Sequence, residues 1–344
     1  MNSLEVALNV EVESEKFEPK DNESSHKIDR HEILFNAIVK KSPKIVEDLL
    51  KMENWNLDAT NIVGETALLV AFINDRMDIV DLLLKYEAKI EETLVVAIQK
   101  GLVDIVEKIL TFDIDMYMVH EVANQSPINF AIQINNLTIV KILLKHNFDV
   151  NHETFIGSLP LQVAVSTENI EIIKELLKNG AKPDVYDENE MTPLMNALGI
   201  DRFDIAEILL ENGAAINSRS VNGLTALHHA AKNGKVNVIK FLMKNNANID
   251  SVDWHKSTPL DVANGLPEVV KTLLLNGANP NLLGVIGCTP FANSSNKMRI
   301  YYFDYARNLD LNIRNSKGYT PFEDDLRYND ISSAKMICYY LSHA

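Results

Sequence analysis

Residues 192–197 of the chain read Thr-Pro-Leu-Met-Asn-Ala, residues 225–230 read Thr-Ala-Leu-His-His-Ala and residues 258–263 read Thr-Pro-Leu-Asp-Val-Ala. The first residues of these phrases are spaced by 33. Two looser copies upstream, which begin at Leu159 and Ser126, keep the same step. Four successive intervals of 33 residues indicate a chain built from one structural unit repeated many times.

Each phrase carries the signals that open a helix. Thr or Ser suits the N-cap because its side-chain oxygen accepts a backbone N–H bond, and Pro suits the first helical position. An aliphatic run follows each phrase, as at residues 172–177, with apolar residues at helical spacing. Several of these runs end in Asn-Gly-Ala, as at residues 212–214, where a left-handed Gly can end a helix. Each unit is therefore expected to be a pair of helices.

The phrase, the period, the aliphatic run and the Gly terminator together resemble the ankyrin repeat. The resemblance covers residues 30–344. It implies an all-α fold, a solenoid of about ten helix-turn-helix repeats with short connecting hairpin loops. The predicted repeats begin at residues 32, 66, 92, 126, 159, 192, 225, 258, 289 and 320.

Two details of the loops can be predicted from these spacings. The third repeat begins only 26 residues after the second, so the hairpin before Glu92 must be nearly absent. A polar residue also recurs just past the second helix, where we expect it to bond its own backbone and shape the loop. The residues at this position in the successive repeats are Asp58, Asn151, Asp184, Asn217, Asp250, Asn281 and Asn312.

Three segments are predicted along the chain. Residues 1–29 hold eight acidic residues against three lysines, which is typical of a disordered acidic tail. An alternative for this tail is a strand that joins a partner's sheet, because apolar residues alternate from Leu4 to Val12. Residues 30–285 form repeats 1–8. Residues 286–344 form divergent repeats 9–10, which act as a C-terminal cap or begin a structure that the chain does not finish.

Composition narrows the class of partner. The chain of 344 residues has a formal net charge of −15, the wrong sign for a surface that neutralises phosphates, so we expect no binding to nucleic acid or membrane.

Only two cysteines occur, far apart, which favours a reducing compartment. No secretory signal or apolar run of membrane-spanning length is present. We therefore expect a cytoplasmic protein that can also enter the nucleus.

No catalytic motif can be identified. Phosphate-binding Gly-rich loops, HExxH helices and nucleophile elbows are missing from the sequence, so we expect no enzyme activity, no cofactor and no metal. A degenerate catalytic segment in residues 286–344 would need a cluster of ionisable side chains that the sequence does not suggest. The resemblance implies that His228 makes structural hydrogen bonds rather than binding a metal.

Binding is instead expected at the loop tips and on the concave face formed by the first helices, as the resemblance implies. Trp254 stands out, because an exposed Trp is over-represented among residues that dominate protein interfaces. The alternative is that its ring folds down onto the neighbouring repeat. The candidate partner-binding residues are Trp254, His255, Phe155, Ile156, Glu188, Asn189, Asn222, Lys232 and Asn233.

The sequence thus favours a monomeric protein-protein interaction scaffold, an adaptor or inhibitor. The net charge of −15 favours a partner with a basic surface. The alternative function is the recognition arm of a larger signalling, channel or ubiquitin-ligase assembly.

Overall fold

The computed structural model describes residues 30–40, 42–52, 55–114, 119, 126–152, 159–284 and 287–343. In these ranges the secondary structure is helical apart from one isolated bridge between Thr60 and Thr66, so the prediction of an all-α fold is confirmed. The chain divides into two compact units, Met1–Asp149 and Val150–Ala344. No helix of the described ranges is long and apolar enough to cross a lipid bilayer. The predicted tail, residues 1–29, lies outside them.

The described helices of the first unit come in pairs joined by short loops, an arrangement that makes the two members of a pair antiparallel neighbours. They are α2 (Arg30–Lys40), α3 (Pro43–Met52), α4 (Ala67–Ile73), α5 (Met77–Lys85), α6 (Ile90–Gln99), α7 (Val103–Ile109), α9 (Pro127–Gln133) and α10 (Leu137–Lys145). Helix α6 begins four residues after Tyr86, the C-cap of α5, so the predicted loss of the hairpin before the third repeat is confirmed.

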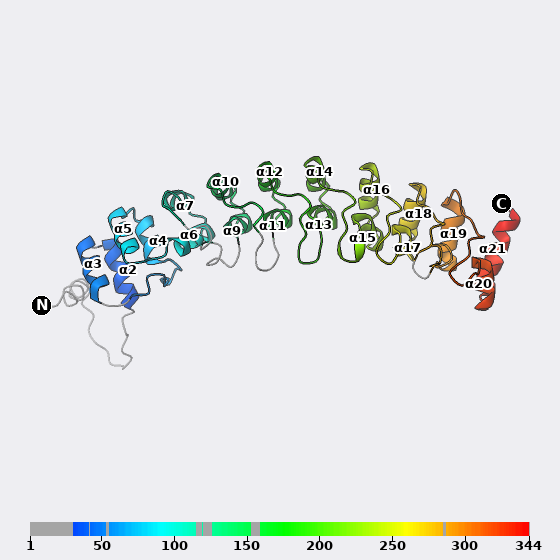
Figure 1. Ribbon diagram of the computed structural model, residues 1–344, viewed down its shortest axis with the longest axis horizontal. Helices are drawn as coiled ribbons and strands as arrows, with labels where there is room; N and C mark the ends of the chain where they lie inside the picture. Colours follow the sequence, from blue (N-terminus) through cyan, green and yellow to red (C-terminus); the bar gives the residue numbers. More distant parts are fainter. Residues whose placement is uncertain are drawn as a thin grey trace, which may run out of the picture. The chain divides into compact units, whose positions relative to one another are not determined.

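The second unit continues the same pattern. Its described elements are α11 (Pro160–Ser166), α12 (Ile170–Lys178), α13 (Pro193–Gly199), α14 (Phe203–Glu211), the 3-10 turn η1 (Val221–Gly223), α15 (Ala226–Lys232), α16 (Val236–Lys244), α17 (Pro259–Val262), α18 (Pro267–Leu275), α19 (Asn296–Tyr305), α20 (Pro321–Arg327) and α21 (Ile331–His343). The first helices α11, α13 and α15 lie in one row and the second helices α12, α14 and α16 in another, with hairpin loops extending past the first row (Figure 1).

The helix starts follow the predicted capping chemistry. Thr192 accepts a bond from the backbone N–H of Met195, and Pro193 occupies the first position of α13. The apolar stripe of α12 is fully buried, with Ile172, Ile173 and Leu176 all at 0% exposure. Burial stabilises by about 1.5–3 kcal/mol for each such side chain, so contacts between neighbouring repeats are the main source of stability.

The recurring Asn or Asp after the second helix acts differently from the prediction. Instead of bonding its own loop, it accepts a backbone N–H from the following repeat. Asp184 Oδ1 lies 2.8 Å from the Ala215 nitrogen, and Asp250 Oδ1 lies 2.9 Å from the Asn279 nitrogen. The same bond joins Asp58 to Lys89, Asn151 to Lys182, Asn217 to Asn248 and Asn281 to Asp310. Stacking places the next chain turn within reach of the carboxylate or amide oxygen, so the residue links repeats.

Loss of one such link should have a measurable effect on stability. We expect Asp250→Ala to lower the free energy of unfolding by about 1 kcal/mol, the net contribution of one hydrogen bond. Asp250→Asn is the matched control and should be nearly neutral, since Asn217 makes the same bond in the preceding repeat. Urea titrations followed by circular dichroism measure both. Equal losses for the two variants would show that the acceptor oxygen is not what matters.

The ninth repeat departs from its predicted pattern. Its phrase at Thr289 forms a single turn, with the Asn293 nitrogen 3.1 Å from the Thr289 oxygen, and the helix α19 begins later. Ser294 explains the break, because its hydroxyl donates to the Phe291 carbonyl oxygen at 2.7 Å and competes with the helical bond. Ser294 is the sixth residue of the phrase, a position that is Ala in each of the five repeats with the 33-residue step.

Candidate functional site

The predicted loop-tip residues that the structure describes in the second unit lie on three consecutive hairpins. We call them the hairpin-tip surface, and all of them are exposed: Glu188, Asn189, Val221, Asn222, Trp254 and His255. Each pair stands four and five residues after the Asn or Asp that links the repeats, so the repeat register fixes its place. The surface is therefore a row of exposed side chains, and packing in the core does not determine which residue types occupy it.

In two of the three hairpins an Asp holds the tip in shape, and the Asp of the third hairpin in the row, Asp253, is buried. Asp253 Oδ1 accepts from the backbone nitrogens of His255 and Ser257 at 2.8 and 2.7 Å. Asp187 Oδ1 accepts from Asn189 and Met191 in the same way, at 2.9 Å each. These bonds satisfy the backbone of the turn internally. The tips are preorganised rather than free to adapt.

Trp254 combines exposure with a fixed position. Its side chain remains 68% exposed, while its backbone nitrogen donates to the Asn222 oxygen at 3.0 Å. The ring lies against Gly223, where an added Cβ would stand only 2.6 Å from Trp254 Cδ1. Arg219 Nη1 adds a further link between the hairpins by donating to the Val252 carbonyl oxygen at 2.5 Å. Both alternatives for this Trp hold in part, because the ring rests on the neighbouring hairpin and still presents most of its surface.

The other candidate residues fall into two groups. Lys232 and Asn233 end α15 and are exposed, away from the hairpin tips at the far end of that helix. Phe155 and Ile156 lie outside the described residues.

Two exposed apolar residues in the first unit escaped the sequence interpretation. Ile62 is fully exposed at 104%, and Val63 is 57% exposed, at the tip of the hairpin between α3 and α4. They stand four and five residues after Asp58, the same register as Trp254 and His255 after Asp250. Counting from the linking residue would have found them.

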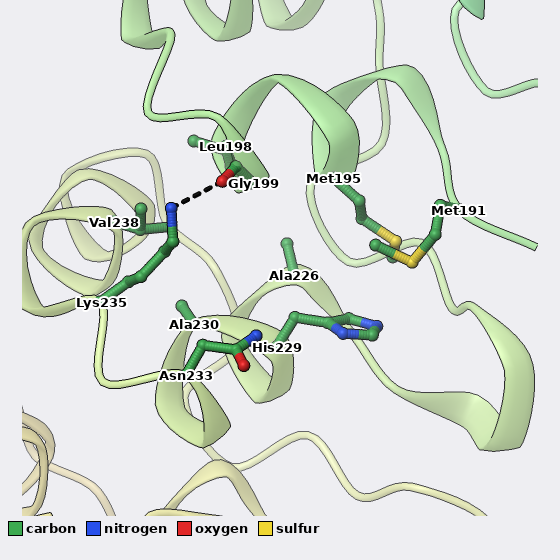
Figure 2. Close-up of a pocket in the computed structure, with 10 residues that line it drawn as sticks. All are labelled: Met191, Met195, Leu198, Gly199, Ala226, His229, Ala230, Asn233, Lys235 and Val238. Atoms are coloured by element: carbon green, nitrogen blue, oxygen red, sulfur yellow. Dashed lines mark hydrogen bonds between the residues drawn. The ribbon is translucent and has the colours of Figure 1, made fainter. Parts of the chain in front are cut away.

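A cavity of about 110 Å³ lies in the second unit between α13 and α15. Figure 2 shows Met191 and Met195 at one end, Lys235 at the other, and the side chains of His229 and Asn233 along α15. Lys235 Nζ donates to the Gly199 carbonyl oxygen at 2.6 Å and to Asp201 Oδ2 at 2.8 Å. The candidate residue Asn233 therefore lines a cavity, which the sequence did not indicate.

The two adjacent histidines have structural bonds. His228 is 1% exposed; its Nδ1 lies 2.9 Å from Thr225 Oγ1 and its Nε2 lies 2.9 Å from the Ser257 carbonyl oxygen in the next repeat. His229 Nε2 lies 2.8 Å from Ser220 Oγ. The prediction of a hydrogen-bonding role for His228 is confirmed. No group of three or more His, Cys, Asp or Glu side chains that could hold a metal occurs among the described residues.

The same burial makes stability depend on pH. Burial lowers the pKa of His228 and of His229 below the ordinary value of 6.5. Below about pH 6.5 the unfolded chain then binds more protons than the folded one. The stability that the two neutral histidines contribute is therefore complete above that pH and is lost as the pH falls towards their lowered pKa values. We expect the unfolding midpoint to decrease between pH 7.5 and 5.

Thermal melts of a His228→Gln, His229→Gln double variant test this expectation, and the decrease over that range should be smaller than in the parent chain. His255→Gln, at an exposed tip, is the control and should keep the parent dependence. An unchanged pH dependence in the double variant would contradict the assignment.

Comparisons with known proteins agree with this architecture. A family model described as ankyrin repeats in three copies matches residues 94–187, 128–220 and 194–283, together more than half of the chain. The solved ankyrin repeat domain of Bcl-3, a member of the IkappaB protein family, superposes with a TM-score of 0.54 at 20% identity. That match covers 60% of this chain and 95% of the Bcl-3 domain, and it supports the fold alone.

Sequence relatives include short transient receptor potential channel 4 of mouse, rat and human. Each is 29% identical over 126 residues, which cover 33% of this chain. The matched region spans only 13% of the length of those channel proteins. The repeated phrase, the paired helices and the matching family model lead to one conclusion: the chain belongs to the ankyrin repeat family.

Proposed function

We propose that the chain is a scaffold, an adaptor or inhibitor, that binds another protein through its hairpin-tip surface and the exposed end of α15. The single observation that carries the proposal is Trp254, a large ring that is 68% exposed yet held by its neighbours. A preorganised aromatic side chain loses little conformational entropy on binding, which is why Trp is enriched among interface residues that contribute most.

The remaining properties of the proposed scaffold follow from charge and loop length. A net charge of −15 favours a partner with a basic surface, because opposite potentials speed association, and disfavours nucleic acid and anionic membranes. Short connecting loops leave little room for an enclosed catalytic site, so we propose that the chain acts by binding and not as an enzyme. We further propose that it works as a monomer in the cytoplasm, with access to the nucleus.

A Trp254→Ala substitution tests the proposal. We expect it to weaken partner binding by about 30-fold, the effect of losing about 2 kcal/mol at an interface hot spot. The measurement is affinity capture from a cell lysate by the full chain, with quantitative mass spectrometry of bound proteins. Circular dichroism should show unchanged helix content, since the ring contributes to no buried core.

Leu341→Ala is the matched control for this capture. Leu341 is 63% exposed, like Trp254, but lies on α21, away from the hairpin-tip surface. Partners that survive Trp254→Ala at full strength would exclude the hairpin-tip surface as the binding site. Partners lost equally in both variants would indicate nonspecific capture by apolar side chains.

A second candidate function is the recognition arm of a larger assembly. It is favoured by the 29% identity to segments of short transient receptor potential channel 4, in which the matched region is a small part of a much longer chain. Native gel electrophoresis of the endogenous protein distinguishes the two functions. Migration near the mass of a monomer or of a small complex supports the scaffold, whereas quantitative recovery in a membrane-bound assembly supports the arm.

A further inference from the structure

His228 joins α15 to the base of the hairpin that carries Trp254. The residue is 1% exposed, and its Nε2 lies 2.9 Å from the Ser257 carbonyl oxygen. Its Nδ1 accepts from the Thr225 backbone nitrogen at 3.2 Å, so the neutral ring must carry its proton on Nε2 and donate it to Ser257. Both ring nitrogens are therefore occupied, and a second proton would point at the N–H of Thr225.

His229, the next residue, contacts the preceding hairpin. Its Nε2 lies 2.8 Å from Ser220 Oγ, at the base of the hairpin that carries Asn222. The two hairpins are also joined to each other, because the Trp254 nitrogen donates to the Asn222 oxygen at 3.0 Å. Two of the three hairpins of the hairpin-tip surface are therefore held by one pair of adjacent imidazoles.

The surroundings of the two rings favour their neutral forms. Burial is the largest factor and lowers the pKa of both below the ordinary value of 6.5. For His228 the hydrogen-bonded carbonyl and the Asp253 carboxylate oppose this effect, and Arg219 adds to it. For His229 the neighbouring His228 and Lys232 both lower the pKa further. A proton on either ring would thus place a positive charge where burial disfavours it.

Charged groups on the neighbouring elements give such a proton little compensation. Asp261, at the start of α17, accepts from the Thr258 nitrogen at 2.8 Å, and burial raises its pKa, so it loses its charge as the pH falls. Lys235 lines the same cavity as His229 (Figure 2), and its ammonium group is paired with Asp201 at 2.8 Å.

We infer that the histidine pair, His228 and His229, is an acid-sensitive switch that holds the hairpins of Asn222 and Trp254 in their binding position at neutral pH and releases them when the imidazoles take up protons. The inference rests on the proposed function and deepens it, because it names a condition that regulates the same surface. A charged ring must move towards water, and in doing so it gives up its bond to the hairpin. A hairpin tip without a fixed position loses more conformational entropy on binding.

The direction of the effect follows from the sign of the pKa shifts. Because both pKa values are lower in the folded chain, the bonded arrangement is complete above pH 6.5 and is lost as the pH falls towards the lowered values. A partner that binds only the bonded arrangement must, by linkage, favour neutral imidazoles. Its affinity should therefore decrease as the pH falls.

Trp254 itself reports the state of its hairpin. The full chain in a Trp55→Phe background has no other Trp, so the fluorescence anisotropy of Trp254 can be followed from pH 7.5 to 5.0, well below the melting temperature. We expect the anisotropy to fall as the pH drops below 6.5, because the ring gains local motion, while circular dichroism shows an unchanged helix content.

Gln162 shows which substitution keeps the bond without the titration. It occupies the position of His228 in its own phrase, and its Nε2 donates to the Met191 carbonyl oxygen, the counterpart of Ser257, at 2.8 Å. His228→Gln should therefore remove most of the anisotropy change down to pH 5.0. His228→Ala has no bond to offer and should show the low anisotropy already at pH 7.5.

Two control variants exclude the other groups that titrate near the ring. His255→Gln removes the exposed imidazole next to Trp254, and Asp261→Asn removes the carboxyl group with the raised pKa. Both should keep the pH dependence of the parent chain. The inference is overturned if either control loses this dependence while His228→Gln keeps it, or if the anisotropy of the parent chain does not change with pH.

Partner capture separates the inference from the proposed function. Proteins captured at pH 7.5 are washed at pH 5.5, and His228→Gln should retain up to about tenfold more of them than the parent chain, the limit for one proton over one pH unit. Equal retention by both chains overturns the inference, and capture that still depends on Trp254 leaves the scaffold function in place. If the anisotropy change requires His228 while Trp254→Ala leaves capture unchanged, the switch in the hairpins stands and the proposed binding surface fails.

Discussion

Asp325→Ala is expected to destabilise the C-terminal repeats by about 3–5 kcal/mol, because it leaves the guanidinium of Arg299 buried without its counter-charge. Arg299 on α19 and Asp325 on α20 form a bidentate pair, with Nη1–Oδ2 and Nη2–Oδ1 distances of 2.5 and 3.1 Å. Their side chains are only 4% and 11% exposed. The pair thus ties the divergent ninth repeat to the tenth.

Of the carboxylates that the structure describes, Asp325 alone forms an ion pair with Arg299, although the guanidinium also contributes, after the hydrogen bonds from Ser333, to the lowered pKa of Asp330. Its guanidinium stands over the ring of Phe291, 5.0 Å from the centroid, and Nη2 also donates to the Ala292 carbonyl oxygen at 3.2 Å. These contacts orient the group but do not neutralise it. In a repeat array the loss would appear as an early unfolding transition of the last repeats, because each repeat is stabilised mainly by its neighbours.

Urea denaturation followed by circular dichroism and hydrogen exchange measures this transition. Arg299→Met with Asp325→Leu should recover most of the lost stability, since well-packed apolar residues can replace a buried ion pair. Arg314→Ala is the control: its pair with Glu323 has side chains 58% and 43% exposed, and such a pair contributes at most about 1 kcal/mol. A loss of under 1 kcal/mol for Asp325→Ala would mean that the pair is solvated in solution.

The sequence was sufficient for features that repeat. The 33-residue step and the helix signals predicted the helix pairs, and His228 could be interpreted because its position in the phrase carries a known hydrogen-bonding role. The register of the loops placed the tips of Asn222 and Trp254 correctly. Such features depend on local chemistry that every copy shares.

Contacts between repeats could not be predicted from the sequence. The oxygen of Asp250 bonds a nitrogen 29 residues away, a partner that becomes near only when repeats stack. The cavity between α13 and α15 is likewise lined by residues of two repeats, such as Met195 and Ala226, which come together only when repeats stack. Ser294 ended a predicted helix through one side-chain bond.

Gly223→Ala is expected to lower the free energy of unfolding by about 2–4 kcal/mol, the second large effect on stability. The backbone there has φ of 77°, a left-handed conformation that costs a residue with a Cβ about 1–2 kcal/mol. Glu190 and Lys256 adopt a similar φ at the same place in their own hairpins, so the backbone alone does not require Gly. The decisive factor is the ring of Trp254, 2.6 Å from the added Cβ.

Gly318→Ala separates the two contributions. Gly318 holds the same position in its hairpin with φ of 85°, and no atom lies within 4 Å of its added Cβ, so this variant should show the backbone cost alone. Gly223→Ala should in addition shift Trp254 and change its fluorescence, which can be isolated in a Trp55→Phe background. Equal losses for the two variants, with unchanged Trp254 emission, would mean that the ring does not rest on Gly223. A displaced ring in a folded chain would instead weaken partner capture as Trp254→Ala does, because the side chain would remain present but lose its preorganised position.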